Sequence, residues 1–211
     1  MKKLNVLVSA YACNPLGSIQ FYPGEDTIGW KLVEQLCRFH NVWVITHSYN
    51  RELIREALNQ RKVSGVNFYF IDLPPSLRLL NKAEFGIRIY YYLWQIRAWR
   101  IAKRLHQKFN IDLAHHITFG NDWMPSFIGA LLPIPFIWGP IGGGQKTPRG
   151  FKREYSLYGQ FAEGVRSVSQ WFGRNDYFRR RCIKQARAIL VCNEETKAKI
   201  PIKYQNKIHF F

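Results

Sequence analysis

The chain has 211 residues, with 31 lysines and arginines against 14 aspartates and glutamates, and a formal net charge of +17 at pH 7. Hydrophobic residues make up 47% of the sequence, which is enough for a core and excludes a mainly disordered chain. The length suits one large domain or two small ones, and we predict a single domain over residues 1–211.

No segment is predicted to cross a membrane. The longest apolar stretches, residues 89–94 and 127–138, are shorter than the roughly 20 residues of a spanning helix, and prolines interrupt the second stretch. The N-terminus, Met1-Lys2-Lys3, leads into a short apolar run without a small-residue cleavage site, which is atypical of a secretory signal. These features predict a cytoplasmic protein.

The cysteines form no recognisable metal or disulfide pattern. Cys13, Cys37, Cys182 and Cys192 lack C-x-x-C spacing and have no histidine at ligand spacing, which a zinc site would require. We therefore predict free thiols, no metal and no cofactor.

Strand-like and helical patterns alternate from the start of the chain. Residues 4–10 predict a buried strand, a loop rich in glycine and proline follows, and residues 30–40 have the apolar spacing of a helix. Next come a predicted strand over 42–46, a helix capped by Asn50, and a strand over 66–71.

The alternation continues to the last residues. After a basic helix within 79–108, the sequence predicts strands over 113–117, 136–138 and 188–192, helices near 125–132, 157–172, 176–187 and from Glu194, and a last apolar segment over 208–211. Strands that alternate with helices form a parallel sheet covered on both faces. The predicted fold class is therefore α/β, with a doubly wound, mostly parallel sheet.

Two stretches hold most of the positive charge. Residues 79–108 contain seven lysines and arginines against one acidic residue, and residues 146–187 contain eleven against three. In the first stretch, apolar residues recur every three or four positions on one helix face: Ile87, Tyr91, Trp94, Ala98, Ile101 and Leu105.

Two interpretations of this basic amphipathic helix stay open. It can lie on an anionic membrane surface, with Arg97, Arg100 and Lys103 as contacts and its tryptophans and tyrosines at the interface. It can equally pack on a core and turn a basic face to solvent. Nucleic acid is not an expected partner, because neither zinc-finger nor RNA-recognition spacing is present.

Ligands of open parallel sheets bind outside the carboxyl ends of the strands, so the loops there are candidate sites. The loop after the first strand contains Gly24, Glu25 and Gly29 and opens a helix. Its glycines could let a phosphate approach backbone N–H groups at the helix N-terminus. The loop lacks G-x-G-x-x-G spacing, and a plain long turn explains it equally well.

Two later strands also end in candidate residues. His115 and His116 end the fourth strand, where successive side chains point to opposite faces, so at most one of them faces a cleft. Gly142, Gly143 and Gly144 follow the fifth strand and could form an anion-binding nest or a simple hinge. No carboxylate pair, Ser-His-Asp set or Cys-His set accompanies these loops, so hydrolase chemistry is not indicated.

Several segments together resemble the N-terminal half of GT-B glycosyltransferases, in the large retaining group called family four or group 1. They are residues 6–15, 24–25, 29–30, 42–47, 91–95, 112–116 and 138–144. The resemblance implies an acceptor-side domain, with a C-terminal nucleotide-sugar domain and the family's glutamate pair absent from these residues. Two positions depart from the family pattern: Thr27 replaces a usual glycine, and the histidines are adjacent, with Ile117 where a second one is common.

The resemblance predicts transfer of a hexose from a nucleotide sugar to a glycan or lipid-linked acceptor in cell-envelope polysaccharide synthesis. Gly24, Glu25, Gly29 and the glycines at 142–144 would line the donor, and His115 or His116 would orient the reacting sugar. A peripheral position on the inner membrane face is a further expectation. This chain alone is not expected to transfer sugar efficiently, and the alternative is a non-catalytic relative that binds an anionic glycan or membrane surface.

Overall fold

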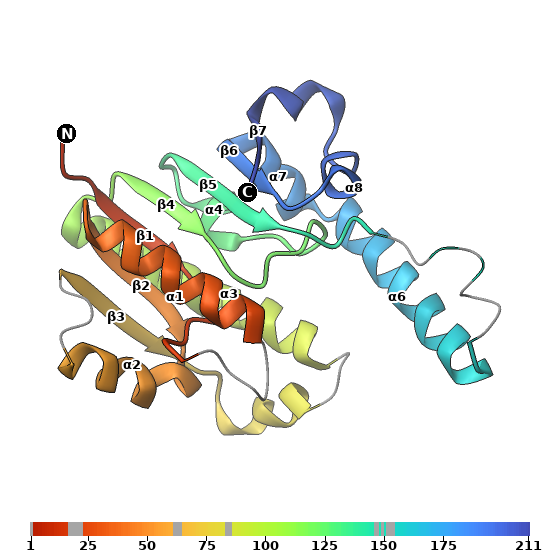
Figure 1. Cartoon of the computed structure of the whole chain (residues 1–211), viewed down its shortest axis with the longest axis horizontal. Coiled ribbons are helices and arrows are strands. Elements are labelled where there is room, and N and C mark those ends of the chain that lie inside the picture. Colours follow the sequence, from red (N-terminus) through yellow and green to blue (C-terminus); the bar gives the residue numbers. More distant parts are fainter. Residues whose placement is uncertain are drawn as a thin grey trace.

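The strands form one sheet, and every strand pair in it is parallel (Figure 1). The computed structural model describes residues 2–16, 23–60, 65–82, 86–145, 148, 150 and 155–211. Within this described part of the chain, seven strands lie in the order β3-β2-β1-β4-β5-β6-β7. They are β1 (Asn5–Ser9), β2 (Asn41–His47), β3 (Val66–Ile71), β4 (Leu113–His116), β5 (Phe136–Ile141), β6 (Ala186–Val191) and β7 (Ile208–Phe210). The predicted α/β class with a doubly wound sheet is confirmed.

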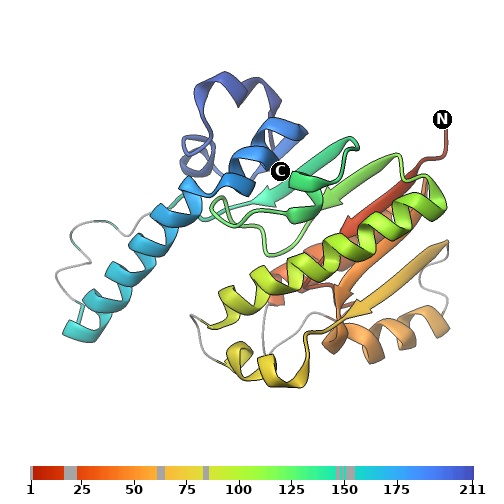
Figure 2. The same cartoon turned by 180° about the vertical axis from the view of Figure 1, so that it is seen from behind.

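Helices cover both faces of this sheet (Figures 1 and 2). One face packs against α1 (Pro23–Cys37) and α2 (Arg51–Asn59), and the other against α3 (Gly86–Phe109), α4 (Phe127–Leu131) and α7 (Tyr177–Gln185). The remaining helices are α6 (Leu157–Asn175), α8 (Glu194–Lys197) and the 3₁₀ helices Ser48–Asn50, Pro75–Lys82 and Ile202–Lys207.

The two faces have separate hydrophobic cores because side chains alternate along each strand. In β1, Val6 and Val8 belong to the core beneath α1 and α2, whereas Leu7 packs with Trp94 of α3 and Trp138 of β5. All five side chains are fully buried. This two-sided burial explains why the strand sequences are almost continuously apolar.

Helix α1 begins seven residues earlier than the apolar spacing predicts, and it ends at Cys37. Gly24, Glu25 and Gly29 therefore lie in the helix, so the prediction that they form a loop is wrong. Pro23 stands at the first helical position, which its fixed φ favours. Acidic side chains in the first turn also interact well with the helix dipole.

Asn50 directly precedes α2, but its side chain makes no capping hydrogen bond, contrary to the prediction. Its Nδ2 atom instead donates to the Tyr11 carbonyl at 3.0 Å and to Thr46 Oγ1 at 2.8 Å. Asn50 is fully buried, and its amide ties the end of β2 to the loop after β1.

The chain changes winding direction between β1 and β4. From β1 it runs outward through β2 to β3, and then returns to β4 on the other side of β1. The carboxyl ends of β1 and β4 thus flank a topological switch point, the usual ligand position in such sheets. Within the described part of the chain, we find no helix with the length and apolarity needed to span a bilayer.

Candidate site at the carboxyl edge of the sheet

Glu25 links the start of α1 to the loop after β4. Its Oε2 accepts a hydrogen bond from the Phe119 N–H at 2.9 Å, and its Oε1 accepts one from the Gly120 N–H at 3.2 Å. Burial raises the pKa of the Glu25 carboxyl, and the two backbone donors partly oppose this rise. The carboxylate therefore occupies a pair of backbone donors that could otherwise hold a small anion.

The two glycines predicted to line the donor have different surroundings in α1. A Cβ on Gly29 would lie 2.2 Å from the Ala12 carbonyl oxygen, so Gly29 lets the helix pack directly on the loop after β1. A Cβ on Gly24 would meet nothing within 4 Å, and Gly24 is exposed. Of the two, only Gly24 lies where a ligand could approach it without moving the chain.

The glycine run after β5 is built into the fold. The Gly142 N–H donates to the Gly120 carbonyl at 2.7 Å, and the Gly144 N–H donates to Thr196 Oγ1 at 3.1 Å. Gly143 has a φ of +86°, a backbone conformation that favours glycine. Because the N–H groups of Gly142 and Gly144 donate to other protein groups, these residues do not form the open three-amide nest that the sequence suggested.

These contacts bring three predicted loops to one place. Gly120 donates to Glu25 through its N–H and accepts from Gly142 through its carbonyl. The start of α1, the end of β4 and the glycine run after β5 therefore meet beside the switch point. A Cβ on Gly142 would have open space around it, with the Gly120 oxygen 3.9 Å away.

The histidines of β4 point to opposite faces, as the strand geometry predicts, but both are enclosed. His115 Nε2 lies 2.8 Å from the Gly139 carbonyl oxygen, and His116 Nε2 lies 3.1 Å from the Tyr91 hydroxyl. Burial lowers the pKa of His115 to about 4 and that of His116 to about 3. Both rings are consequently neutral at pH 7, where they can donate or accept a hydrogen bond but supply no positive charge.

A row of enclosed polar atoms crosses three strands at the same level. Ser9, His116 and Trp138 are register partners on β1, β4 and β5. Ser9 Oγ, His116 Nδ1 and Trp138 Nε1 are buried and have no hydrogen-bond partner among the described residues. Buried polar atoms usually have hydrogen-bond partners. These three unpaired polar atoms are therefore an unusual feature of the core beside the switch point.

Sequence reasoning missed an ion-pair cluster behind the glycine run. Asp122 is fully buried, and Arg174 contacts it with two nitrogens, at 2.8 Å to Oδ2 and 3.2 Å to Oδ1. Arg174 also donates to the Gly143 carbonyl at 3.2 Å, and Arg179 donates to the Asp122 carbonyl. The cluster fixes the glycine run against α6 and α7, and no local motif predicts it because its partners are about fifty residues apart.

A second polar cluster lies where β2 and β3 end. The Tyr49 N–H donates to His47 Nδ1 at 3.2 Å, which leaves the proton of a neutral ring on Nε2. Nε2 lies 3.0 Å from the Tyr90 hydroxyl, and that hydroxyl donates to Asp72. Ser48 Oγ donates to the other Asp72 oxygen at 3.0 Å. This chain of hydrogen bonds lies at the same edge of the sheet as Glu25.

Helix α3 packs on the sheet through its apolar face. Tyr90, Tyr91 and Trp94 are at most 1% exposed, so the interpretation that places these aromatic residues at a membrane interface is wrong. The apolar stripe of α3 that would enter lipid packs on the hydrophobic core of the sheet instead. Arg97, Arg100 and Lys103 are exposed, and Arg97 also donates to the Asp72 carbonyl.

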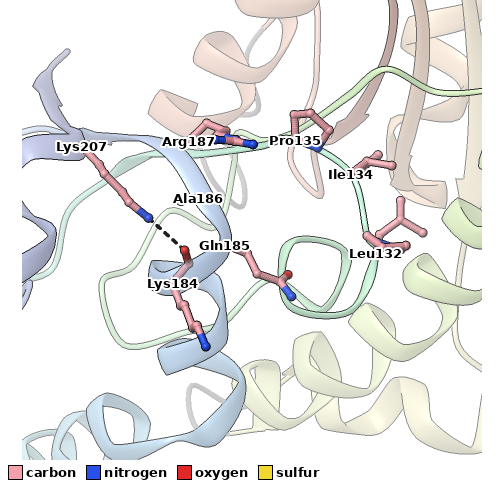
Figure 3. Close-up of a pocket in the computed structure, with 9 residues that line it drawn as sticks. Leu132, Ile134, Pro135, Lys184, Gln185, Ala186, Arg187 and Lys207 are labelled. Atoms are coloured by element: carbon pink, nitrogen blue, oxygen red, sulfur yellow. Dashed lines mark hydrogen bonds between the residues drawn. The ribbon is translucent and has the colours of Figure 1, made fainter.

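A cavity of about 510 Å³ lies away from these clusters (Figure 3). Residues 132–135, just before β5, line one side of it, and residues 184–187, where α7 ends and β6 begins, line another. Lys207 projects toward it and donates to the Lys184 carbonyl at 2.9 Å. The cavity therefore opens at the amino ends of the strands, opposite the edge that the sequence indicates, and we place the candidate site by chemistry at the carboxyl edge.

All four cysteines are free thiols, as predicted. Among the residues that the structure describes, no group of three or more histidine, cysteine, aspartate or glutamate side chains is arranged to hold a metal ion. No protein-family model matches the chain, and no curated protein matches it significantly. Fold and site geometry therefore carry the functional argument.

Proposed function

We propose that this chain is the acceptor-side domain of a retaining GT-B glycosyltransferase, which transfers a hexose from a nucleotide sugar to a glycan or lipid-linked acceptor in cell-envelope polysaccharide synthesis. The observation that carries the proposal is the meeting of Glu25, Gly120 and Gly142 beside the switch point. The start of α1, the loop after β4 and the glycine run after β5 share this edge, and it is the usual ligand position in this fold class.

The chemistry of the edge suits sugar hydroxyls better than phosphate. Two acidic side chains, Glu25 and Asp26, occupy the first turn of α1, and their charge would repel a diphosphate there. A carboxylate has further lone pairs, so Glu25 can accept hydrogen bonds from hydroxyl groups while it holds the Phe119–Gly120 turn. In the proposal, the donor phosphates lie toward the glycine run at 142–144, and a second domain supplies the nucleotide site.

The histidines then have a positional role. A neutral His115 or His116 cannot neutralise a departing diphosphate, but it can hold a neighbouring group in place. His116 acts on Tyr91, and His115 acts on the backbone at Gly139, three residues before the glycine run. Stabilisation of the leaving group would come from fixed dipoles. The proposal includes a cytoplasmic location at the inner membrane face.

A titration with nucleotide sugars tests the proposal. Once a nucleotide-sugar domain is supplied, calorimetry with uridine- and guanosine-diphosphate hexoses is expected to give saturable binding that Gly142→Ala weakens, because the added methyl group enters open space at the edge. Gly164→Ala on α6 is the matched control, since a Cβ there meets nothing within 4 Å and lies outside the candidate site. Absence of binding by every donor in the presence of that domain, or equal binding by both variants, would contradict the proposal.

A non-catalytic module that binds an anionic glycan or membrane surface is the second candidate. The exposed basic side of α3, with Arg97, Arg100 and Lys103, favours it. Reversing these three charges to glutamate is expected to reduce co-sedimentation with anionic vesicles. Sugar transfer or donor hydrolysis by the chain would reject the module, whereas ligand binding without any turnover, also after a nucleotide-sugar domain is supplied, would support it.

A further inference from the structure

Helix α6 (Leu157–Asn175) leaves a row of large apolar side chains in solvent. The exposed fractions are 82% for Tyr158, 70% for Phe161, 56% for Val168, 61% for Trp171 and 64% for Phe172. Their spacing of three or four residues puts them on one side of the helix. We call this row, together with Val165, the α6 face.

Among the residues that the structure describes, none forms a core beneath the α6 face. Figures 1 and 2 show α6 extending away from the sheet, with only its C-terminal end beside the body of the protein. There Gly173 packs so closely on Trp123 that a Cβ would lie 2.4 Å from the Trp123 carbonyl oxygen. No described side chain from 158 to 169 is buried. Contiguous exposed apolar surface of this kind marks an interaction site.

The excess positive charge of the chain favours an anionic partner. Residues 146–187, which contain α6, carry eleven lysines and arginines against three acidic residues. The chain as a whole carries a formal charge of +17, so two copies repel each other, which disfavours self-association through the α6 faces. Within α6, Arg166 pairs with Glu163 at 3.5 Å, while Arg180 and Lys184 of the adjoining α7 are exposed. An anionic surface complements this segment.

We propose that the α6 face inserts into the interface of an anionic lipid bilayer. Tyrosine, tryptophan and phenylalanine are the side chains that settle at the boundary between headgroups and acyl chains, and nearby basic residues attract anionic lipids. Helix α3 is a poorer candidate, because its apolar stripe packs on the core and, of its large apolar side chains, Ile89 is the exposed one among the described residues. The proposal is independent of the proposed sugar transfer.

Tryptophan fluorescence can report whether the α6 face enters a membrane. Trp30, Trp43, Trp94, Trp123 and Trp138 are at most 7% exposed. Trp99 is half-buried, which leaves Trp171 as the exposed tryptophan in a chain that has seven. A blue shift of tryptophan emission on addition of vesicles would therefore report Trp171 entering an apolar environment.

The experiment compares vesicles of 30:70 phosphatidylglycerol and phosphatidylcholine with vesicles of phosphatidylcholine alone, without any sugar donor. The chain is expected to co-sediment with the anionic vesicles and to show the blue shift. Phe161→Ser with Val168→Ser should weaken the partition coefficient about tenfold or more, since two apolar anchors are lost. Trp171→Phe should bind with little blue shift. Phe39→Ser with Ile202→Ser is the matched control, because both residues are exposed apolar side chains outside α6.

Several results would overturn the proposal. Absence of binding to anionic vesicles would overturn it. If sedimentation velocity then showed a dimer that the α6 substitutions abolish, the α6 face would be a protein–protein contact instead. Equal losses in the α6 and control variants would also overturn the proposal, as would binding that responds to charge reversal on α3 alone. Circular dichroism and the thermal midpoint verify that each variant is folded.

Discussion

Acid pH should destabilise the protein through its two buried histidines. Burial lowers the pKa of His115 from 6.5 to about 4 and that of His116 from 6.5 to about 3. As the pH falls below 6.5, the unfolded chain gains protons that the folded protein does not bind. The stabilisation is therefore complete above pH 6.5 and is lost as the pH falls toward the folded-state values.

These shifts give the size of the effect. Between pH 8 and pH 5, an unfolded-state pKa of 6.5 and a folded-state pKa near 4 or 3 reduce the free energy of unfolding by about 2 kcal/mol for each ring. Both histidines together give about 4 kcal/mol. This is a large part of the total stability of an ordinary domain, about 5–15 kcal/mol.

Urea unfolding at a series of pH values measures this loss. His116→Asn should lose about 2 kcal/mol less than the natural chain between pH 8 and pH 5, whatever its stability at pH 8. His209→Asn, which removes an exposed histidine, serves as the control and should keep the full loss. The carboxylates titrate in every variant, so the difference isolates the buried ring. An unchanged loss in His116→Asn would refute the reasoning, because it would mean that the ring does not lie neutral in a dry site.

Three further predictions concern the elements that hold the candidate site together. Gly29→Ala should lower the free energy of unfolding by about 2 kcal/mol or more, because its Cβ would overlap backbone. Gly24→Ala should change it by less than about 1 kcal/mol, and similar thermal midpoints for the two would contradict the packing described. Glu25→Gln should lower the free energy of unfolding, measured in urea, by about 1–3 kcal/mol, since the carboxylate accepts two backbone hydrogen bonds. No loss would show that these hydrogen bonds do not stabilise the Phe119–Gly120 turn. Asp122→Asn should lower the free energy of unfolding by about 3–5 kcal/mol, because it leaves Arg174 without its counter-charge. Adding Arg174→Met should restore part of this loss, and a double variant no more stable than Asp122→Asn would contradict the role of the ion pair.

The edge of the sheet combines rigid support with few free donors. Glu25 holds one turn, Arg174 holds the glycine run, and the histidines are hydrogen-bonded to protein groups. Such pre-organisation suits the proposed function, in which this edge positions a ligand and a second domain supplies the nucleotide site. Nucleotide-sugar binding measured with and without a nucleotide domain would therefore be informative about how the work is divided.

The sequence by itself determined the alternation of strands and helices, the parallel sheet and the edge at which candidate residues gather. It could do so because apolar periodicity and the ends of strands are local properties of the chain. Local patterns could not show that Gly24 and Gly29 lie inside α1, or that the Gly142 N–H donates to the Gly120 carbonyl. Those facts depend on which backbone groups meet after folding.

Only the tertiary structure decided which amphipathic face is covered. The stripes of α3 and α6 have the same kind of spacing, but the first packs on the sheet and the second extends away from it. It also decided the pairing of Asp122 with Arg174 and the burial that keeps the histidines neutral. Burial and long-range pairing depend on what surrounds a side chain in space, and a sequence pattern specifies only its neighbours along the chain.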